Sequence, residues 1–300
     1  MTQARPLARL SALVTGGGTG IGLGITRRLL EAGAEVTIAA RRLEVLDGAA
    51  AALRQQISSA IVRTTRCDTT LEPEVVAAVA MASQRRGRLD IAVANAGTLG
   101  GGPILASDPS EWTRVFDVHV VGAMLLMKHA ALAMRDGAGG SIVAISSPTA
   151  ANLFAFGGPY GPSKAALEFG PIGVRVNAIR AGLVATDLAT TLMQRREIME
   201  RLKAMAVLRL QGTAEGIGDA VAFLSSPGAS WITGQVLSVD GGLSVPQGPS
   251  TEAAAREILG AEFFDRLYPH RQKNDRPKEA AGRPVDRKPG TPARRKHDAS

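Results

Sequence analysis

A glycine-rich turn between a strand-like and a helix-like segment is the feature that most constrains the fold of this chain. Leu10–Val14 is a short apolar run of strand formers, and Leu23–Leu30 has the pattern of a helix. Between them Gly16, Gly20 and Gly22 give the spacing G-x-x-x-G-x-G. Such a unit brings backbone N–H groups and a helix N-terminus close to a pyrophosphate. The turn therefore predicts a dinucleotide site, with a flexible connector as the alternative.

Strand and helix patterns continue to alternate as far as Gly242. Further strands are predicted at Glu35–Ala40, Leu89–Ala94, Ser141–Ile145 and Val174–Ile179. Alternation of this kind favours a parallel sheet with helices on both faces, which explains why the strands are apolar throughout. We predict an α/β fold: a doubly wound, Rossmann-like parallel sheet of six to seven strands in a single domain.

The residues after the second strand favour NADP over NAD. In a dinucleotide fold this strand end meets the adenosine ribose, where an acidic residue would bind the 2′-hydroxyl of NAD. Ala40 occupies that place here, and Arg41 and Arg42 follow it. A guanidinium group suits a 2′-phosphate. Two solvated arginines are the alternative interpretation.

Ser147, Tyr160 and Lys164 are candidates for catalysis. Tyr160 and Lys164 are four residues apart, so on a helix they share a face. A nearby ammonium group lowers the pKa of a phenol from its ordinary value of about 10. If a serine hydroxyl holds the substrate oxygen, the phenol could transfer a proton to or from that oxygen while a cofactor transfers a hydride. Alone the Y-x-x-x-K spacing is a weak signal, and an exposed helix face is the alternative.

From about Leu7 to Gly242 the chain resembles the short-chain dehydrogenase/reductase family. The glycine turn that begins at Thr15 is similar to the cofactor motif of that family. The other matching motifs follow in the same order along the chain: Cys67-Asp68, Asn95-Ala96-Gly97, Ser147 with Tyr160 and Lys164, Gly182 with Thr186, and Val239-Asp240-Gly241-Gly242.

The resemblance implies an NAD(P)-dependent oxidoreductase that interconverts a secondary alcohol and a ketone. It implies that Tyr160 is the general acid/base, that Lys164 binds the nicotinamide ribose, and that Ser147 positions the substrate oxygen. The cofactor contacts that it implies, together with the two arginines above, are Thr15, Gly16, Gly18, Thr19, Gly20, Ile21, Gly22, Arg41, Arg42, Asp68, Asn95, Ala96, Gly97, Tyr160, Lys164, Gly182, Val184 and Thr186.

The chain departs from the family pattern at three places. His119 stands where the family carries an asparagine that holds a water for proton relay. Histidine also donates and accepts, so His119 is a further catalytic candidate, with a buried structural histidine as the alternative. Ala181 replaces the proline before Gly182. The stretch from Lys164 to Asn177 is about nine residues, or two and a half helical turns, shorter than the resemblance implies.

These departures leave a second function open, a cofactor-binding but catalytically weak protein with a regulatory or scaffold role. They also bear on assembly, because the shortened helix forms the main dimer contact in the family. The resemblance implies a homodimer or homotetramer. The segments expected around the pocket mouth are rich in apolar residues and favour a small lipophilic carbonyl or alcohol substrate, although they could simply pack on the body: Leu99–Leu105, Thr149–Phe156 and Leu183–Leu210.

Charge and composition divide the chain into three parts. The net charge is +8, and residues 269–300 contribute +6 of it from ten Lys/Arg and four Asp/Glu. We predict a dinucleotide-binding domain over residues 1–248, a possible helix over 249–268 and a disordered basic tail over 269–300. Such a tail could contact nucleic acid or anionic lipid. No aromatic platform or nucleic-acid motif accompanies it, so nucleic acid is not favoured as a partner.

The remaining features narrow the class of protein. Cys67 is the only cysteine, which excludes an intrachain disulfide and fits a core position. The histidines lack metal-ligand spacing, so no metal is predicted. Met1–Leu10 lacks the apolar core of a signal peptide, and no membrane span is expected, so the predicted location is cytoplasmic. Trp112 and Trp231 are expected to pack in the body.

Overall fold

The structure is a computed structural model that describes residues 5–101, 104–135, 139–150, 174–186, 196–208, 210–245 and 257–267. The chain divides into two compact units, Met1–Val245 and Pro246–Ser300. In the second unit, helix α11 (Ala261–Leu267) lies within the predicted helical segment 249–268. The predicted tail at 269–300 lies outside the described residues.

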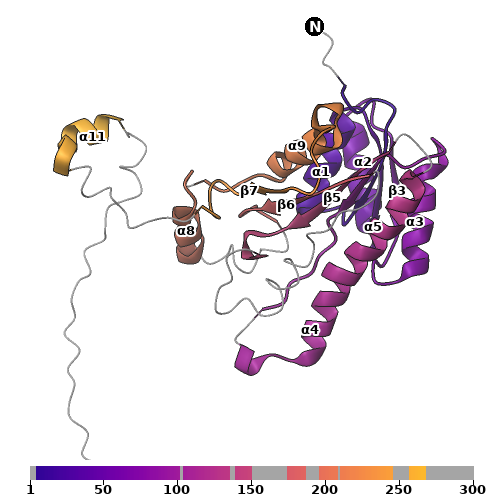
Figure 1. The fold of residues 1–300 in the computed structure, drawn as a ribbon, viewed down its shortest axis with the longest axis horizontal. Helices are drawn as coiled ribbons and strands as arrows, with labels where there is room; N and C mark the ends of the chain where they lie inside the picture. The colour runs from indigo at the N-terminus through magenta and orange to yellow at the C-terminus, as the bar shows by residue number, and fades with distance from the viewer. Residues whose placement is uncertain are drawn as a thin grey trace, which may run out of the picture. The chain divides into compact units, whose positions relative to one another are not determined.

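Seven parallel strands form one sheet in the first unit, in the order β3-β2-β1-β4-β5-β6-β7. The chain runs from β1 outward to β3, returns to place β4 on the other side of β1, and then continues outward to β7 (Figure 1). This topology confirms the predicted doubly wound sheet. The strands are β1 (Ser11–Thr15), β2 (Glu35–Ala40), β3 (Val62–Arg66), β4 (Ile91–Ala94), β5 (Ser141–Ser146), β6 (Arg175–Ala181) and β7 (Val236–Val239).

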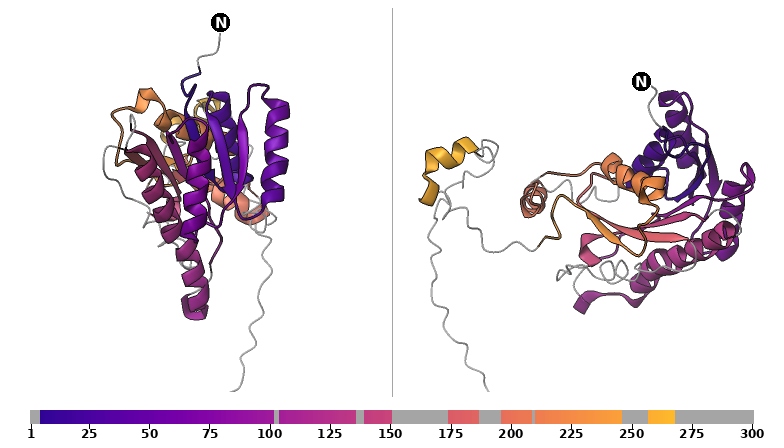
Figure 2. Two further views of the ribbon diagram at one scale, coloured as in Figure 1. Left: turned by 90° about the vertical axis from the view of Figure 1, so that its right-hand side faces the viewer. Right: turned by 45° about the horizontal axis from the view of Figure 1, so that its top comes forward.

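Helices cover both faces of the sheet (Figure 2). One helix is continuous from residue 109 to residue 134 and contains a π-helical turn at its centre. The helices are α1 (Gly20–Glu31), α2 (Leu43–Gln56), α3 (Glu72–Gln84), α4 (Pro109–Phe116), the π-helical η2 (Asp117–Val121), α5 (Gly122–Met134), α8 (Arg196–Met205), α9 (Ala214–Ser225) and the 3₁₀ turns η1 (Ile104–Ala106), η3 (Pro148–Ala150) and η5 (Pro227–Ala229).

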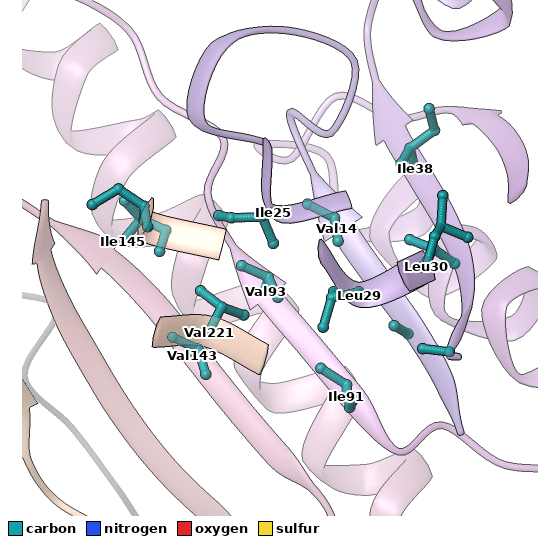
Figure 3. Packing of buried hydrophobic residues seen from close by; sticks show 14 of the residues in the cluster. Val14, Ile25, Leu29, Leu30, Ile38, Ile91, Val93, Val143, Ile145 and Val221 are labelled. Atoms are coloured by element: carbon teal, nitrogen blue, oxygen red, sulfur yellow. The ribbon is translucent and has the colours of Figure 1, made fainter. Parts of the chain in front are cut away.

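Two hydrophobic clusters form the core, one on each face of the sheet. Strand side chains alternate between the faces, so Val14 and Val93 enter one cluster while Leu13 and Ala92 enter the other. The first cluster packs the sheet against α1, α2 and α9, as Figure 3 shows for part of it. The second packs the sheet against α3 and α5. Burial on both faces explains why the strands lack the polar alternation of a half-exposed sheet.

Helices α1 and α9 pack so closely that two glycines are required at their contact. A Cβ atom added to Gly24 would lie 2.4 Å from the carbonyl carbon of Ala214. A Cβ atom on Gly218 would lie 2.7 Å from the carbonyl oxygen of Gly24. Because these neighbours are backbone atoms, a side chain at either position could be accommodated only by separating the helices.

The sheet is continuous across the position where the chain is shorter than the family pattern. Strand β6 pairs with β5 in parallel, from Arg175 opposite Ser141 to Arg180 opposite Ser146. The predicted strand Val174–Ile179 is thus present, displaced toward its C-terminus. The sheet therefore includes β6 in its expected place beside β5. Residues 151–173 themselves lie outside the described part of the chain.

The prediction that no segment could span a membrane overlooked the continuous helix Pro109–Met134. Among the described helices, this one is long and apolar enough to cross a membrane by length and composition. A single helix of this kind is weak evidence, because core helices pass the same test. Here Leu125, Leu126 and Met134 are buried in the second core cluster, so part of the apolar composition serves packing within the fold.

The expectation that both tryptophans pack in the body was wrong for one of them. Trp112 is half-buried and stacks on Phe116, with ring centroids 6.1 Å apart. Trp231 is 98% exposed, next to the short turn η5. Residue type alone favours burial of a large aromatic ring, but β7 is an edge strand and leaves this part of the surface without a covering element among the described residues.

We expect Gly24→Ala to destabilise the protein by about 1–3 kcal/mol, because the methyl group must displace the backbone of α9. Gly48→Ala is the matched control. Gly48 lies in helix α2 and its added Cβ would meet nothing within 4 Å, so alanine should stabilise the helix by about 0.5–1 kcal/mol. Urea unfolding followed by circular dichroism measures both. Equal effects at the two positions would contradict the packing argument.

Candidate functional site

The predicted site residues follow the carboxyl ends of neighbouring strands. Gly16 follows β1, Arg41 follows β2, Asn95 follows β4, Ser147 follows β5, and Gly182 follows β6. Since the strands are parallel, all of these positions lie along one edge of the sheet. The strand order reverses between β1 and β4, which is where open α/β sheets bind ligands.

The glycines of the first turn are required by its conformation and by close contacts. Gly16 has φ +66° and Gly20 has φ +50°, values that favour glycine. A Cβ atom on Gly22 would lie 2.1 Å from the carbonyl oxygen of Gly16. A Cβ atom on Gly20 would lie 3.0 Å from Cγ2 of Thr186, so the turn after β1 reaches the segment after β6. The predicted cofactor positions Gly20 and Thr186, which follow different strands, are therefore close neighbours.

The N-terminus of α1 opens directly from this turn and suits an anionic group. Thr19 is the N-cap residue, and its side chain makes no capping hydrogen bond. The first turn of the helix contains no acidic side chain. The positive end of the helix dipole is thus free to face a phosphate. The cradle of Gly16, Gly20 and Gly22 fits a dinucleotide pyrophosphate, since added side chains would fill the turn.

Asn95 joins the turn after β4 to the turn after β1. Its side-chain Nδ2 donates to the carbonyl oxygens of Thr15, at 2.9 Å, and of Gly16, at 3.3 Å. In return, Oγ1 of Thr15 accepts the backbone N–H groups of Asn95 and Ala96, at 3.1 and 3.2 Å, and donates to the carbonyl oxygen of Val93. The two strand ends are therefore cross-linked in both directions.

His119 lies in the π-helical turn and contacts the same loop from the opposite side. Its side chain is 1% exposed, and its Nε2 accepts the backbone N–H of Thr98 at 2.9 Å. An imidazole nitrogen that accepts an N–H carries no proton, so in this contact the ring proton lies on Nδ1. Arg114 holds the loop as well, donating to Oγ1 of Thr98 and, at 2.8 Å, to the carbonyl oxygen of Leu99.

Asp68 is held as a carboxylate at the end of β3. Burial by itself would raise its pKa, but the N–H and hydroxyl groups of Thr70 donate to its Oδ1 and the charges of Arg41 and Arg66 also favour the ionised form. The pKa of Asp68 therefore lies below its ordinary value. Neighbouring Cys67 is buried, and burial raises the pKa of its thiol to about 11, which confirms its core position.

The serine of the predicted catalytic group is ordered in a tight turn. Ser147 follows β5 and is 7% exposed. Its Oγ accepts the backbone N–H of Thr149 at 3.3 Å and lies 2.9 Å from Oγ1 of Thr149. Tyr160 and Lys164 lie outside the described residues. The predicted juxtaposition of the three side chains stays a prediction.

The segment after β6 is fixed by the closing V-D-G-G sequence. Gly182 donates its N–H to the carbonyl oxygen of Val239 at 3.0 Å, and a Cβ atom there would lie 2.4 Å from Cα of Asp240. Val184 forms a β-bridge with Gly212. Because these contacts hold the backbone, the segment is positioned without the proline that Ala181 replaces.

Three predicted cofactor positions also make structural contacts, and their roles toward the cofactor stay predictions. A Cβ atom on Gly18 would lie 2.9 Å from Cδ2 of Leu46, so this glycine allows the turn to pack on α2. Ile21 packs against the core cluster. Arg42 is exposed and is the N-cap residue of α2. The structure thus assigns packing or helix-initiating contacts to these residues.

Sequence reasoning missed Thr98 and Arg114, and it placed Thr149 at the pocket mouth without its contact to Ser147. Each acts through a contact between loops or helices that are distant from one another or locally irregular. The π-helical turn, in which Gly122 donates to the carbonyl oxygen of Asp117, gave no sequence signal. Polar residues just after a predicted strand end are the one signal that could have suggested Thr98 and Thr149.

We expect His119→Phe to lower the free energy of unfolding by about 1–3 kcal/mol, because the N–H of Thr98 loses its acceptor. His119→Asn keeps an acceptor oxygen and should lose less. Urea unfolding at pH 8 compares the two variants. If His119→Phe were as stable as His119→Asn, the contact with Thr98 would not be the role of this side chain in the fold.

Comparison with known proteins extends the match over most of the chain. A family model described as enoyl-(acyl carrier protein) reductase matches residues 16–244. The Rattus norvegicus protein "Dehydrogenase/reductase SDR family member 4" is 33% identical over 252 residues, covering 81% of this chain and 90% of that protein.

Solved structures agree with the sequence match. A short-chain type dehydrogenase/reductase from Mycobacterium ulcerans is 36% identical, with a TM-score of 0.77 and coverage of 86% of this chain and 98% of the other. The Pseudomonas aeruginosa RhlG/NADP active-site complex is 27% identical, with a TM-score of 0.75 and coverage of 82% of this chain and 100% of the other. The chain therefore belongs to the short-chain dehydrogenase/reductase family of NAD(P)-binding oxidoreductases.

Proposed function

We propose that this protein is an NADP(H)-preferring oxidoreductase that interconverts a secondary alcohol and a ketone, with Tyr160 as the general acid/base. The observation that carries the proposal is the assembly of the glycine turn, the Asn95 turn and the Thr186 segment at one edge of the sheet. These elements form a site for a dinucleotide, and Ser147 follows the strand adjacent to β4. The substrate oxygen would lie beside Ser147.

The cofactor would be held by the N-terminus of α1 and by the turns after β1, β4 and β6. The backbone N–H groups at the start of α1 would bind its pyrophosphate. When bound, the nicotinamide supplies a hydride to a ketone or accepts one from an alcohol. Gly182 and Thr186 lie on the β6 side of this site, where they would contact the nicotinamide half. The carboxylate of Asp68 would face the adenine half.

The preference for NADP rests on charge at the end of β2. Arg41 and Arg42 are exposed there, and Ala40 stands where a carboxylate would bind the ribose of NAD. Arg41 lies close enough to Asp68 to lower the pKa of that carboxyl. A guanidinium group at this position favours a 2′-phosphate by charge and by hydrogen bonding. The solved structure of the similar RhlG is an NADP complex.

Proton transfer would be carried out by residues of the chain itself. In reduction the phenol of Tyr160 donates its proton to the carbonyl oxygen as the carbonyl carbon receives the hydride. In oxidation the phenolate takes the proton back from the alcohol. Lys164 stabilises the phenolate by its positive charge, and Ser147 holds the reacting oxygen by a hydrogen bond. If His119 took part in a proton relay through a water molecule, it would do so through its Nδ1–H group. Its Nε2 already accepts the N–H of Thr98.

The substrate would be a small lipophilic carbonyl compound or alcohol. Leu99, Leu105, Leu208 and Leu210 are exposed in the segments predicted to surround the pocket mouth. Apolar side chains in such segments favour substrates with little charge. We also propose that the protein is a homodimer or homotetramer, as the family resemblance implies.

We expect Arg41→Asp to weaken NADPH binding by about 10–100-fold, because it removes a cation and adds an anion beside the 2′-phosphate. The affinity for NADH should change less than about threefold, because NADH lacks this phosphate. Fluorescence titration with both cofactors measures the ratio. Arg5→Asp is the matched control, since Arg5 precedes β1 and so lies at the other edge of the sheet. An unchanged ratio for Arg41→Asp would contradict the NADP assignment.

The test of the function is NADPH oxidation with a panel of ketones: cyclohexanone, 2-octanone and an acetoacetyl thioester. We expect turnover by the wild-type chain. Tyr160→Phe should lower kcat by at least about 100-fold, the usual contribution of general acid/base catalysis, while NADPH affinity stays within about twofold. Persistent activity in Tyr160→Phe would refute the catalytic assignment. Cofactor binding without turnover of any ketone would favour the catalytically weak alternative.

A further inference from the structure

We propose that Thr149 is a positioning residue that directs the hydroxyl proton of Ser147 toward the substrate oxygen. The inference rests on the proposed function, because it concerns the reaction in which Ser147 binds that oxygen. The sequence placed Thr149 only in a segment around the pocket mouth, and its contact with Ser147 gives it a specific role. The evidence is the geometry of the turn from Ser147 to Ala150.

Thr149 approaches Ser147 with two polar groups at once. Its backbone N–H donates to Oγ of Ser147 at 3.3 Å, and its Oγ1 lies 2.9 Å from the same atom. The backbone of the turn is closed by a second contact, in which Ala150 donates its N–H to the carbonyl oxygen of Ser147 at 3.0 Å. Both hydroxyl groups are at least partly buried.

The turn leaves little freedom for this arrangement to change. Ser146, the preceding residue, ends β5 and is paired with Arg180 of β6. Pro148 has a fixed φ and no N–H, so the first N–H after Ser147 belongs to Thr149. Pro148 is also buried within the 3₁₀ turn η3. Thr149 is therefore held against Ser147 by the sheet on one side and by the turn on the other.

The contacts with Thr149 decide which role is left for the Ser147 hydroxyl. A serine oxygen has two acceptor lone pairs and one proton. The N–H of Thr149 uses one lone pair, and the Thr149 hydroxyl uses the other when it donates. The proton of Ser147 must then find its acceptor elsewhere. Ser147 becomes a directed donor rather than a hydroxyl that rotates among several partners.

This is the role that the reaction requires. A ketone oxygen can only accept hydrogen bonds, so Ser147 must donate in order to polarise the carbonyl. The negative charge that develops on the oxygen during hydride transfer strengthens that hydrogen bond in the transition state. Without the Thr149 hydroxyl, Ser147 could rotate its proton away from the substrate. The loss would therefore appear in kcat more than in KM.

The first test compares Thr149→Val, Thr149→Ser and the control Thr113→Val. Valine matches the shape of threonine but lacks the hydroxyl, whereas serine keeps it. Thr113 is exposed on α4, where its hydroxyl donates to the carbonyl oxygen of Pro109, so it undergoes the same chemical change outside the site. We expect Thr149→Val to lower kcat for the best ketone of the panel about tenfold, the value of one hydrogen bond. Thr149→Ser and Thr113→Val should stay within about twofold, on the same reasoning.

A double-mutant cycle with Ser147→Ala separates positioning from a structural effect. If Thr149 acts through Ser147, adding Thr149→Val to Ser147→Ala should leave kcat unchanged. If the losses in kcat of the two single variants multiplied in the double variant, the proposal would be overturned. A Thr149→Val variant that keeps the wild-type kcat would also overturn it. Weaker NADPH binding in Thr149→Val, measured by fluorescence titration, would also overturn it. An inactive wild-type chain would instead refute the proposed function, and with it the role of Thr149.

Discussion

The hydrogen bonds between Thr15, Gly16 and Asn95 are the interaction on which the site depends. They join the first strand to the fourth at the point where the strand order reverses. At this point the helices after the two strands leave on opposite faces of the sheet, so the loops diverge and a crevice can form between them. Side-chain groups must then replace the backbone ladder that would otherwise join the strand ends. Thr15 and Asn95 supply those groups from both sides.

Close packing of backbone segments is the second constraint, and it is met by glycine. The turn after β1 and the contact between α1 and α9 both bring carbonyl groups within about 3 Å of positions where other residues carry Cβ. The two requirements are linked, because α1 begins at Gly20 and contains Gly24. Glycine thus serves two purposes here. It shapes the turn, and it lets α1, whose N-terminus faces the site, pack closely on α9.

The long helix Pro109–Met134 contributes to the site through its irregular centre. A π-helical turn inserts an extra residue into the helical repeat, and His119 falls in this turn. Its imidazole and the guanidinium group of Arg114 hold the loop after β4 at Thr98 and Leu99. A regular helix with the same sequence would present different side chains to that loop. The apolar residues beyond the turn pack α5 on the sheet, so one helix serves both the core and the site.

The sequence alone determined the fold class, because continuous apolar strands, short turns and a glycine-rich strand–helix junction are local features. It also determined which positions follow the strand ends, and hence that Gly16, Asn95, Ser147 and Gly182 meet at one edge. Only the tertiary structure decided that Thr98 and Arg114 belong to the site, that Thr149 holds Ser147, and that Trp231 is exposed. The first outcome depends on contacts between segments far apart in the chain and on a local change of helical repeat. The second depends on the conformation of one turn, and the third on which strand forms the edge. None of these leaves a periodic signal in the sequence.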